Sequence, residues 1–283
     1  MKYLLYLLSV CLLFTQDITK ELDPFERIDL HFPAKTSVEF GDRFYIEVDG
    51  RERDLKELDI DVHRNTLVIE SKRSSFFRFN HNHQQVRIRI VTKSLTRVDV
   101  GASGHVELPE FNQKSLDLNL NGSADVFLSG AIKDLRVDKS GSGDLEITKL
   151  IAEHVDIERS GSGNIDIDGT TDVLSVDASG SGELNWKGIE ADKISISASG
   201  SGSYDFSGET DVLDIELSGS GGFEGDRFTA QRLKADLHGS SDVRLRVEKE
   251  LDARTSGSGD ISYRGEPKIV RKKESGSGDI RRY

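Results

Sequence analysis

The stretch Ser140-Gly141-Ser142-Gly143-Asp144 returns along the chain with small changes, and this repetition decides the fold. Ten copies can be recognised, and in three of them the Ser-Gly-Ser-Gly pattern is altered by substitutions. The fourth position of each copy falls at residues 104, 124, 143, 163, 182, 202, 221, 241, 259 and 278. Steps of 18 to 20 residues between copies indicate a solenoid, in which every repeat contributes one unit that stacks on its neighbours.

Short segments of alternating polarity flank each copy. Leu135-Arg136-Val137 precedes the first intact copy and Leu145-Glu146-Ile147 follows it, and later copies keep the same apolar-polar-apolar pattern. Alternation at period two predicts half-buried strands. Glycine at this density excludes a helix, because each interior Gly costs about 1 kcal/mol there. A strand of about five residues cannot bury its apolar face alone, so we predict an all-β chain whose coils stack about 4.8 Å apart as a parallel β-solenoid.

We predict that the glycines of the intact copies form turns, because Gly reaches positive φ without steric cost and adds no bulk. These structural turn residues are Gly141, Gly143, Gly161, Gly163, Gly180, Gly182, Gly200, Gly202, Gly219, Gly221, Gly257, Gly259, Gly276 and Gly278. The serines of the same copies recur without a histidine base, which a nucleophilic serine requires. We therefore assign them to the turns and name no catalytic residue.

The width of a coil is open at this point. Links such as Ile151-Ala152-Glu153 alternate with links such as Gly169-Thr170-Thr171-Asp172-Val173, so the full pattern repeats every 39 residues or so. One coil could hold two Gly-Ser-Gly turns, which gives roughly five wide coils, or a duplicated pair could give roughly ten narrow ones. We favour the wide coil, because it stacks like links on like.

Residues 1–16 predict a secretory signal peptide, since Lys2 is followed by about a dozen apolar residues, too few for a comfortable membrane span. The protein is therefore expected to be exported to the periplasm, the outer membrane surface or the medium. Cys11 is the only cysteine. We interpret it as an ordinary apolar residue of the signal, with a lipid anchor as the alternative. The mature chain would then contain no cysteine for disulfides or thiol chemistry.

Residues 17–92 are expected to form an N-terminal β cap or the start of the solenoid, and residues 93–283 the repeats. Within the first part, residues 37–40 are expected to pair with 43–48, and residues 58–62 with 66–70. His81 and His83 lie in an aromatic stretch over residues 76–83. We predict a surface loop with exposed aromatic residues there rather than a metal site, because no third ligand is nearby. If that loop is ordered, it is also a candidate contact site.

The residues that follow the copies would form a ladder if the copies stack. They are His105, Asp125, Asp144, Asn164, Glu183, Ser203, Gly222, Asp242, Asp260 and Asp279. Such a ladder could bind Ca²⁺, supply paired carboxylates for sugar chemistry, or accept hydrogen bonds from turn amides. We favour the turn role, because neutral residues interrupt the ladder. No metal or cofactor is assigned, and Ca²⁺ remains the alternative.

The charge balance also restricts the function. The net charge of −12 argues against nucleic acid as a partner, since that partner requires a basic face. Basic residues cluster near the C-terminus, at Lys268, Arg271, Lys272, Lys273, Arg281 and Arg282. Charged terminal strands guard against edge-to-edge aggregation, and we favour that role over a patch for an anionic glycan or a membrane.

The repeats and the segment Pro24-Phe25-Glu26-Arg27-Ile28 before them resemble the head GIN domain family of auto-transporter adhesins from Bacteroidetes-type bacteria, over residues 24–283. The resemblance implies a right-handed parallel β-helix, related in shape to pectin lyases, that lacks catalytic residues and acts in cell-surface adhesion. No binding residue of the family can be carried over, because the motif defines none.

We therefore expect an exported, non-catalytic β-solenoid that presents a repetitive face to a glycan or a surface protein. One alternative is a polysaccharide-active enzyme, which would need carboxylates with Arg or Lys that break the repeat in one groove. Arg244 and Arg246 beside Asp242 are the nearest such group. The other alternative is a purely structural envelope protein. The oligomeric state and the ligand stay open.

Overall fold

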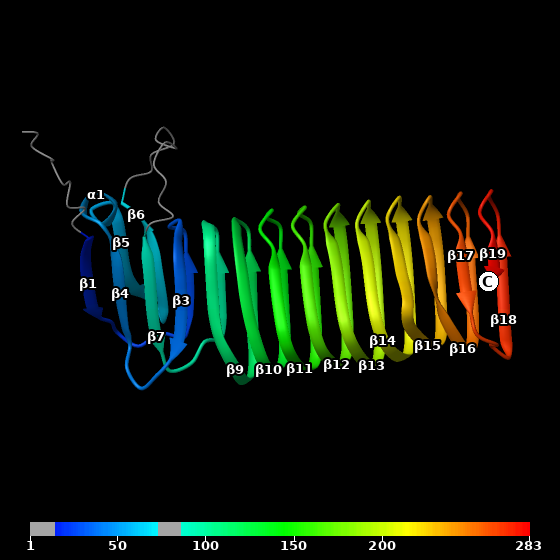
Figure 1. The fold of residues 1–283 in the computed structure, drawn as a ribbon, viewed down its shortest axis with the longest axis horizontal. Coiled ribbons are helices and arrows are strands. Elements are labelled where there is room, and N and C mark those ends of the chain that lie inside the picture. The colour runs from blue at the N-terminus through cyan, green and yellow to red at the C-terminus, as the bar shows by residue number, and fades with distance from the viewer. Residues whose placement is uncertain (1–14, 73–85) are drawn as a thin grey trace, which may run out of the picture.

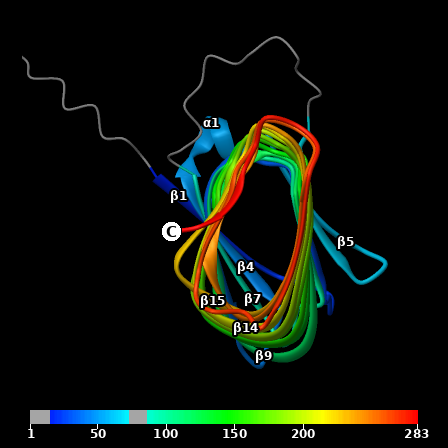
Figure 2. The ribbon, with the colours of Figure 1, turned by 90° about the vertical axis from the view of Figure 1, so that its right-hand side faces the viewer.

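The computed structural model describes residues 15–72 and 86–283. Cys11, His81 and His83 lie outside the described residues, as does all of the predicted signal peptide except Thr15 and Gln16. The described residues form a nineteen-stranded sheet wound into a β-solenoid of about nine turns (Figure 1). Viewed along the axis, the coils superimpose as an oval ring (Figure 2). The predicted all-β solenoid is thus confirmed.

The elements of the N-terminal part are β1 (Thr15–Glu21), β2 (Arg27–Leu30), β3 (Ala34–Phe40), β4 (Tyr45–Arg51), α1 (Glu52–Leu55), β5 (Leu58–His63), β6 (Thr66–Ser71), β7 (Arg87–Thr92) and β8 (Arg97–Val100). The long strands of the solenoid are β9 (Ser103–Leu120), β10 (Ser123–Lys139), β11 (Leu145–Arg159), β12 (Ile165–Gly180), β13 (Glu183–Gly200), β14 (Ser203–Gly219), β15 (Gly222–Gly239) and β16 (Asp242–Thr255). β17 (Ile261–Arg264) and β18 (Ile269–Glu274) belong to the coil after β16, and β19 (Ile280–Arg282) pairs in parallel with β17 and begins the next coil. Among these elements no helix has the length and apolar character that a membrane crossing requires.

Each coil contains one copy of the repeated motif. Val126 pairs with Leu145, Leu145 with Ile165, and Ile165 with Leu184, all in parallel. Neighbouring coils are therefore offset by 19 or 20 residues along the chain. The wide coil that the alternating links favoured is wrong, and the narrow coil is right.

The alternation of the links has a different physical cause. In the column of paired residues at the bend within the long strands, Phe111 lies beside Gly130 and Leu150 beside Gly169. Higher in the stack, Gly208 lies between Ile189 and Phe228. Each large side chain of this column is buried, and a Cβ on each of the three glycines would overlap the carbonyl oxygen of its large neighbour. Neighbouring coils therefore alternate large residue and glycine, so unlike links stack on one another.

The N-terminal part joins the same sheet, but its spatial order differs from its chain order. β3 pairs in parallel with β9 on one side and with β7 on the other, and β4 then pairs antiparallel with β7 and with β1. The expected pairing of residues 37–40 with 43–48 is wrong, because β7 lies between them. The pairing of residues 58–62 with 66–70 is confirmed as the β5–β6 hairpin, with Arg64 and Asn65 at φ of 48° and 68°. The role of this region as a cap stays a prediction.

The interior is a continuous stack of apolar side chains. Aliphatic residues form most of it, and an aromatic cluster fills the middle coils. Phe206 lies 5.3 Å from Phe223 and 6.1 Å from Phe228 between ring centroids, and Trp186 lies 6.3 Å from Phe206. The indole Nε1 of Trp186 donates to the carbonyl oxygen of Gly169 at 2.9 Å. The solenoid thus has a packed core and not a channel.

Candidate functional site

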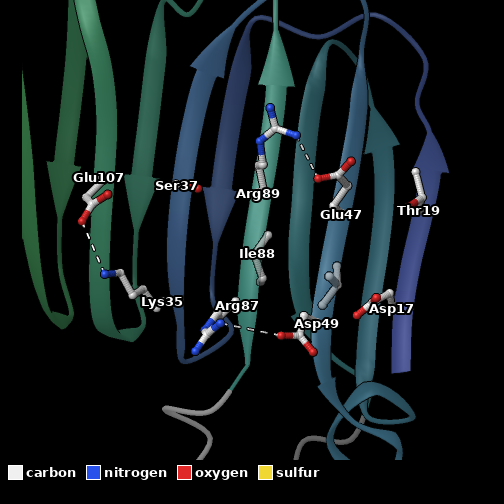
Figure 3. A pocket seen from close by; sticks show the side chains of 11 residues that line it. Asp17, Thr19, Lys35, Ser37, Glu47, Asp49, Arg87, Ile88, Arg89 and Glu107 are labelled. Atoms are coloured by element: carbon white, nitrogen blue, oxygen red, sulfur yellow. Dashed lines mark hydrogen bonds and ion pairs between the residues drawn. The ribbon is translucent and has the colours of Figure 1, made fainter. Parts of the chain in front are cut away.

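A groove of about 530 Å³ lies on the outer face of the N-terminal part of the sheet (Figure 3). Its sides come from β1, β4, β7, β3 and β9, which lie next to one another in that order. Outward positions of these strands carry charged side chains, while the inward positions Val48 and Ile88 belong to the core. Most of this surface lies outside the repeats, so the side chains that line the groove do not recur along the solenoid.

The register arranges the charged side chains in rows across the strands. In one row Asp17 pairs with Asp49, Asp49 with Arg87, and Arg87 with Lys35. In the next row Thr19, Glu47, Arg89 and Ser37 follow in the same strand order. Carboxylates therefore lie toward β1 and β4, and cations toward β7 and β3.

Arg89 is fixed by its neighbours. It donates to Glu39 at 2.7 Å, to Glu47 at 2.9 Å and to the hydroxyl of Tyr45 at 3.1 Å. The hydrogen bonds that Arg89 donates to Glu39 and Glu47 raise the pKa of Arg89, and the bond to Glu39 lowers the pKa of the Glu39 carboxyl. Its donors are occupied within the protein, so Arg89 holds the groove together rather than binding a ligand.

Lys35 and Arg87 are held more loosely. Lys35 Nζ lies 3.6 Å from Glu107, and Arg87 Nη1 lies 4.0 Å from Asp49 (Figure 3). The two side chains are 57% and 75% exposed. They are direct cross-strand partners of β3 and β7, so their charges face solvent side by side. Two adjacent exposed cations can bind a carboxylate, sulfate or phosphate group.

An aromatic pair borders the groove on the side of the repeats. His105 is the partner of Lys35 on β9, and its ring lies 4.6 Å from that of Phe127 on β10. His105 Nε2 is 2.9 Å from Glu107, a contact that lowers the pKa of the Glu107 carboxyl, with Lys35 lowering it further. Half-exposed rings beside charged groups offer a stacking surface to a sugar ring or an aromatic side chain.

A second hollow of about 420 Å³ lies over the bends of β12, β13, β14 and β15. It is lined by Thr170, Asp172, Glu190, Ala191, Asp192, Glu209, Thr210, Asp211 and Gln231. Its five carboxylates have no basic side chain among the lining residues. In the part of the chain that the structure describes, no three His, Cys, Asp or Glu side chains are placed to hold a metal ion.

The ladder after the motif forms a chain of hydrogen bonds between coils. Oδ1 of Asp125 accepts from the amide of Asp144 at 3.0 Å, and Oδ1 of Asp144 accepts from the amide of Asn164 at 2.8 Å. Oδ1 of Asn164 then accepts from the amide of Glu183 at 3.0 Å. The same bond joins Asp242 to Asp260 and Asp260 to Asp279. These five side chains thus accept backbone amides, as favoured, but the amide belongs to the ladder residue of the next coil and not to the residue's own turn.

The glycines of the motif lie at or just beyond the strand ends, where successive coils approach closely. A Cβ on Gly141 would overlap the carbonyl oxygen of Gly122, and the other thirteen predicted turn glycines each face a carbonyl oxygen of the preceding coil in the same way. Only Gly180 and Gly200 of these fourteen have φ in the left-handed region, at 140° and 130°. Close approach therefore explains the glycines better than positive φ does.

The structure does not bring the sequence-derived enzyme candidates together as a site. Asp242 is occupied in the ladder. Arg244 lies 4.0 Å from Glu224 and over the ring of Tyr283, and Arg246 lies 3.0 Å from Glu248. The groove residues were missed because their strands are not repeats. One feature of the sequence could have indicated the groove: the predicted strands 43–48 and 86–91 carry charged residues at their outward positions.

The chain belongs to the family described as "Putative auto-transporter adhesin, head GIN domain", which matches residues 24–188 and 157–267. The predicted family is thus confirmed. No curated protein matches the chain.

The solved structures that are similar to this chain include two of the same fold. One is a "Putative lipid binding protein" from Parabacteroides distasonis, with 22% identity and a TM-score of 0.53 over 95% of this chain and 96% of that chain. The other is a "putative adhesin" from the same species, with 17% identity and a TM-score of 0.55 over 95% of this chain and 97% of that chain. At these identities the likeness concerns the fold alone.

Proposed function

We propose that this chain is an exported, non-catalytic adhesin that binds a glycan or surface protein through the groove of β1, β4, β7, β3 and β9. The observation that carries the proposal is the exposed pair Lys35 and Arg87, adjacent across β3 and β7 and only loosely matched by carboxylates. Membership of an adhesin family supports the binding role and the export. A glycan that bears carboxylate or sulfate groups suits this pair best.

Binding to an array of neutral, carboxylated and sulfated glycans tests the proposal, with and without Ca²⁺. We expect saturable binding to an acidic class that is unchanged by chelation, because the carboxylates of the ladder accept amide hydrogen bonds. The variant Lys35→Ser/Arg87→Ser should lose at least tenfold in affinity, since each charge-assisted contact contributes about 1.5–3 kcal/mol.

The matched control is Lys234→Ser/Arg254→Ser, which removes the same charge from outward positions of β15 and β16. If both double variants lose the same affinity, the effect comes from the overall charge of the protein. That result would contradict the groove as the binding site. If the protein binds no glycan on the array, the glycan ligand is excluded. A protein ligand or a structural role in the envelope would then be left.

A polysaccharide-active enzyme is the second candidate, because the groove combines carboxylates with Arg and Lys where the repeat is broken. Sugar hydrolysis requires a carboxyl group whose pKa is raised so that it can act as an acid. At the groove, the contacts of Glu107 with His105 and of Glu39 with Arg89 lower the pKa of both carboxyls. Release of reducing ends from a bound polysaccharide would nevertheless move the enzyme to first place.

A further inference from the structure

The charge balance of the solenoid changes along its length. Strands β9 to β14, residues 103–219, contain eight Lys and Arg against twenty-three Asp and Glu, whereas residues 222–283 contain fourteen against eleven. The change is sharpest at the bends within the long strands, which form the rounded edge of the oval that carries the labels β14 and β15 (Figure 2). Over β12, β13 and β14 this edge carries the hollow with its five carboxylates. The coils that follow carry cations there instead.

Five exposed cations follow the hollow along this edge, and we call them the basic bend. They are Arg227, Arg232, Lys249, Arg264 and Lys268. The register brings them together, because Arg232 shares a column with Glu250 and Ile269, and the amide of Lys268 donates to the carbonyl oxygen of Lys249 at 3.0 Å. Within the residues that the structure describes, none of the five forms an ion pair.

The carboxylates among these cations are already occupied. Three of them accept a hydrogen bond from an arginine outside the basic bend. The pairs are Glu248 with Arg246, Glu250 with Arg271 and Glu266 with Arg282, at 3.0, 2.6 and 2.9 Å. A fourth, Asp226, accepts from the hydroxyl of Tyr283 at 3.2 Å. The protein thus matches its own carboxylates with other groups and leaves the charge of the basic bend facing solvent, where it attracts anions.

Two large side chains with apolar surface lie beside the cations. Ile269 and Tyr283 are each 46% exposed. Ile269 occupies the column of Arg232, and the ring centroid of Tyr283 lies 4.7 Å from the guanidinium carbon of Arg264. An aliphatic side chain and an amphipathic aromatic ring among Arg and Lys form the combination that favours the headgroup region of a lipid bilayer.

We propose that the basic bend docks on a bilayer surface rich in anionic lipid headgroups, with Ile269 and Tyr283 at the boundary between headgroups and acyl chains. Long cationic side chains on a rounded edge reach a flat array of phosphates, whereas a small ligand is normally held in a concave site. The groove lies at the other end of the solenoid (Figure 1), so docking leaves it accessible. The proposal does not depend on the function of the groove.

Flotation of the purified protein with lipid vesicles tests the docking. Vesicles of equal parts phosphatidylcholine and phosphatidylglycerol should bind the protein, and vesicles of phosphatidylcholine alone should not. The variant Arg232→Ser/Lys249→Ser/Lys268→Ser should weaken binding about 100-fold, since each Lys or Arg near an anionic surface contributes about fivefold. The control Lys114→Ser/Lys187→Ser/Lys193→Ser removes the same charge from exposed positions of β9 and β13 and should keep the binding. Equal weakening in both variants, or no binding to the anionic vesicles, overturns the proposal.

Tryptophan fluorescence locates the contact. Trp186 is the only tryptophan and is fully buried, so Ile269→Trp adds one exposed reporter. Its emission should shift to shorter wavelength on the anionic vesicles, whereas Ile151→Trp, at an exposed apolar position of β11, should not shift. Equal shifts in both variants, or none at position 269, contradict the docking. Preference for soluble dextran sulfate over the vesicles, or a salt-sensitive dimer in which the basic bend meets the acidic hollow of a second copy, would also overturn it.

Discussion

At the scale of the residue, the glycines set how closely two coils can approach. Gly141 lies against the carbonyl oxygen of Gly122, and Ser142 beside it donates its amide to that oxygen at 3.1 Å. Gly141→Ala should therefore lower the free energy of unfolding by about 1–3 kcal/mol, the usual cost of forcing atoms into a packed place. Ser142→Ala, at the exposed neighbouring position, should stay within about 0.5 kcal/mol. Urea unfolding measures both, and equal stabilities would contradict the argument.

The ladder allows a second residue-scale prediction. Asp144→Ala leaves the amide of Asn164 without its acceptor and should cost about 1–2 kcal/mol in urea unfolding. Asp144→Asn should restore most of that loss, because Asn164 already performs this role toward the amide of Glu183. A calcium site would respond in the opposite way, since the neutral amide weakens metal binding. An increase of wild-type Tm in millimolar Ca²⁺ that Asp144→Asn abolishes would favour the metal.

At the scale of the element, the coils are not interchangeable. Deleting residues 130–149, one coil of twenty residues, would place Phe111 beside Leu150, two large side chains in one layer. Deleting residues 130–168, two coils and thirty-nine residues, would place Phe111 beside Gly169 and keep the alternation. We expect the two-coil deletion to be the more stable in thermal unfolding, although it removes more core. A more stable one-coil deletion would contradict the alternating column.

The same column shows what the sequence could predict and what it could not. The turn spacing and the period-two alternation predict the strands, because both are local properties of the chain. The coil width depends on how one link packs on the next, and the rule that like stacks on like fails where a large side chain covers a glycine. Likewise, β7 inserts between β3 and β4, a non-local pairing that no turn signal reports. The groove forms only because β7 lies between β3 and β4, so it could not be predicted from the sequence either.

At the scale of the whole molecule, the two ends of the solenoid differ in chemistry. The N-terminal end breaks the parallel stack with antiparallel strands, and this irregularity produces the charged groove. The middle coils repeat one geometry, and their outward surface has net acidic character. A repeated surface suits structure and spacing, whereas the irregular end offers a singular set of side chains for recognition. The proposed adhesin would therefore bind at its N-terminal end.

Strand β18 carries charged side chains in two columns whose members on β16, Ala253 and Thr255, are buried. Lys272 pairs with Ala253 and Glu274 with Thr255, both fully buried. Lys272 donates to the carbonyl oxygen of Ile280 at 2.8 Å, and Glu274 accepts from the amide of Ile280 at 2.8 Å. The two side chains thus connect β18 to β19 over the core by hydrogen bonds. Inward charges on an edge strand oppose stacking by another sheet.

The variant Lys272→Leu/Glu274→Leu tests this closure of the C-terminal end. It would extend the apolar column to the surface and leave the edge of β18 free to pair, so we expect concentration-dependent association in analytical ultracentrifugation. Arg271→Leu/Lys273→Leu adds the same apolar bulk at outward positions of the same strand and serves as the control. If both variants associate equally, exposed hydrophobicity is the cause. If only the inward variant associates, Lys272 and Glu274, and not the outward members of the basic cluster, oppose end-to-end association.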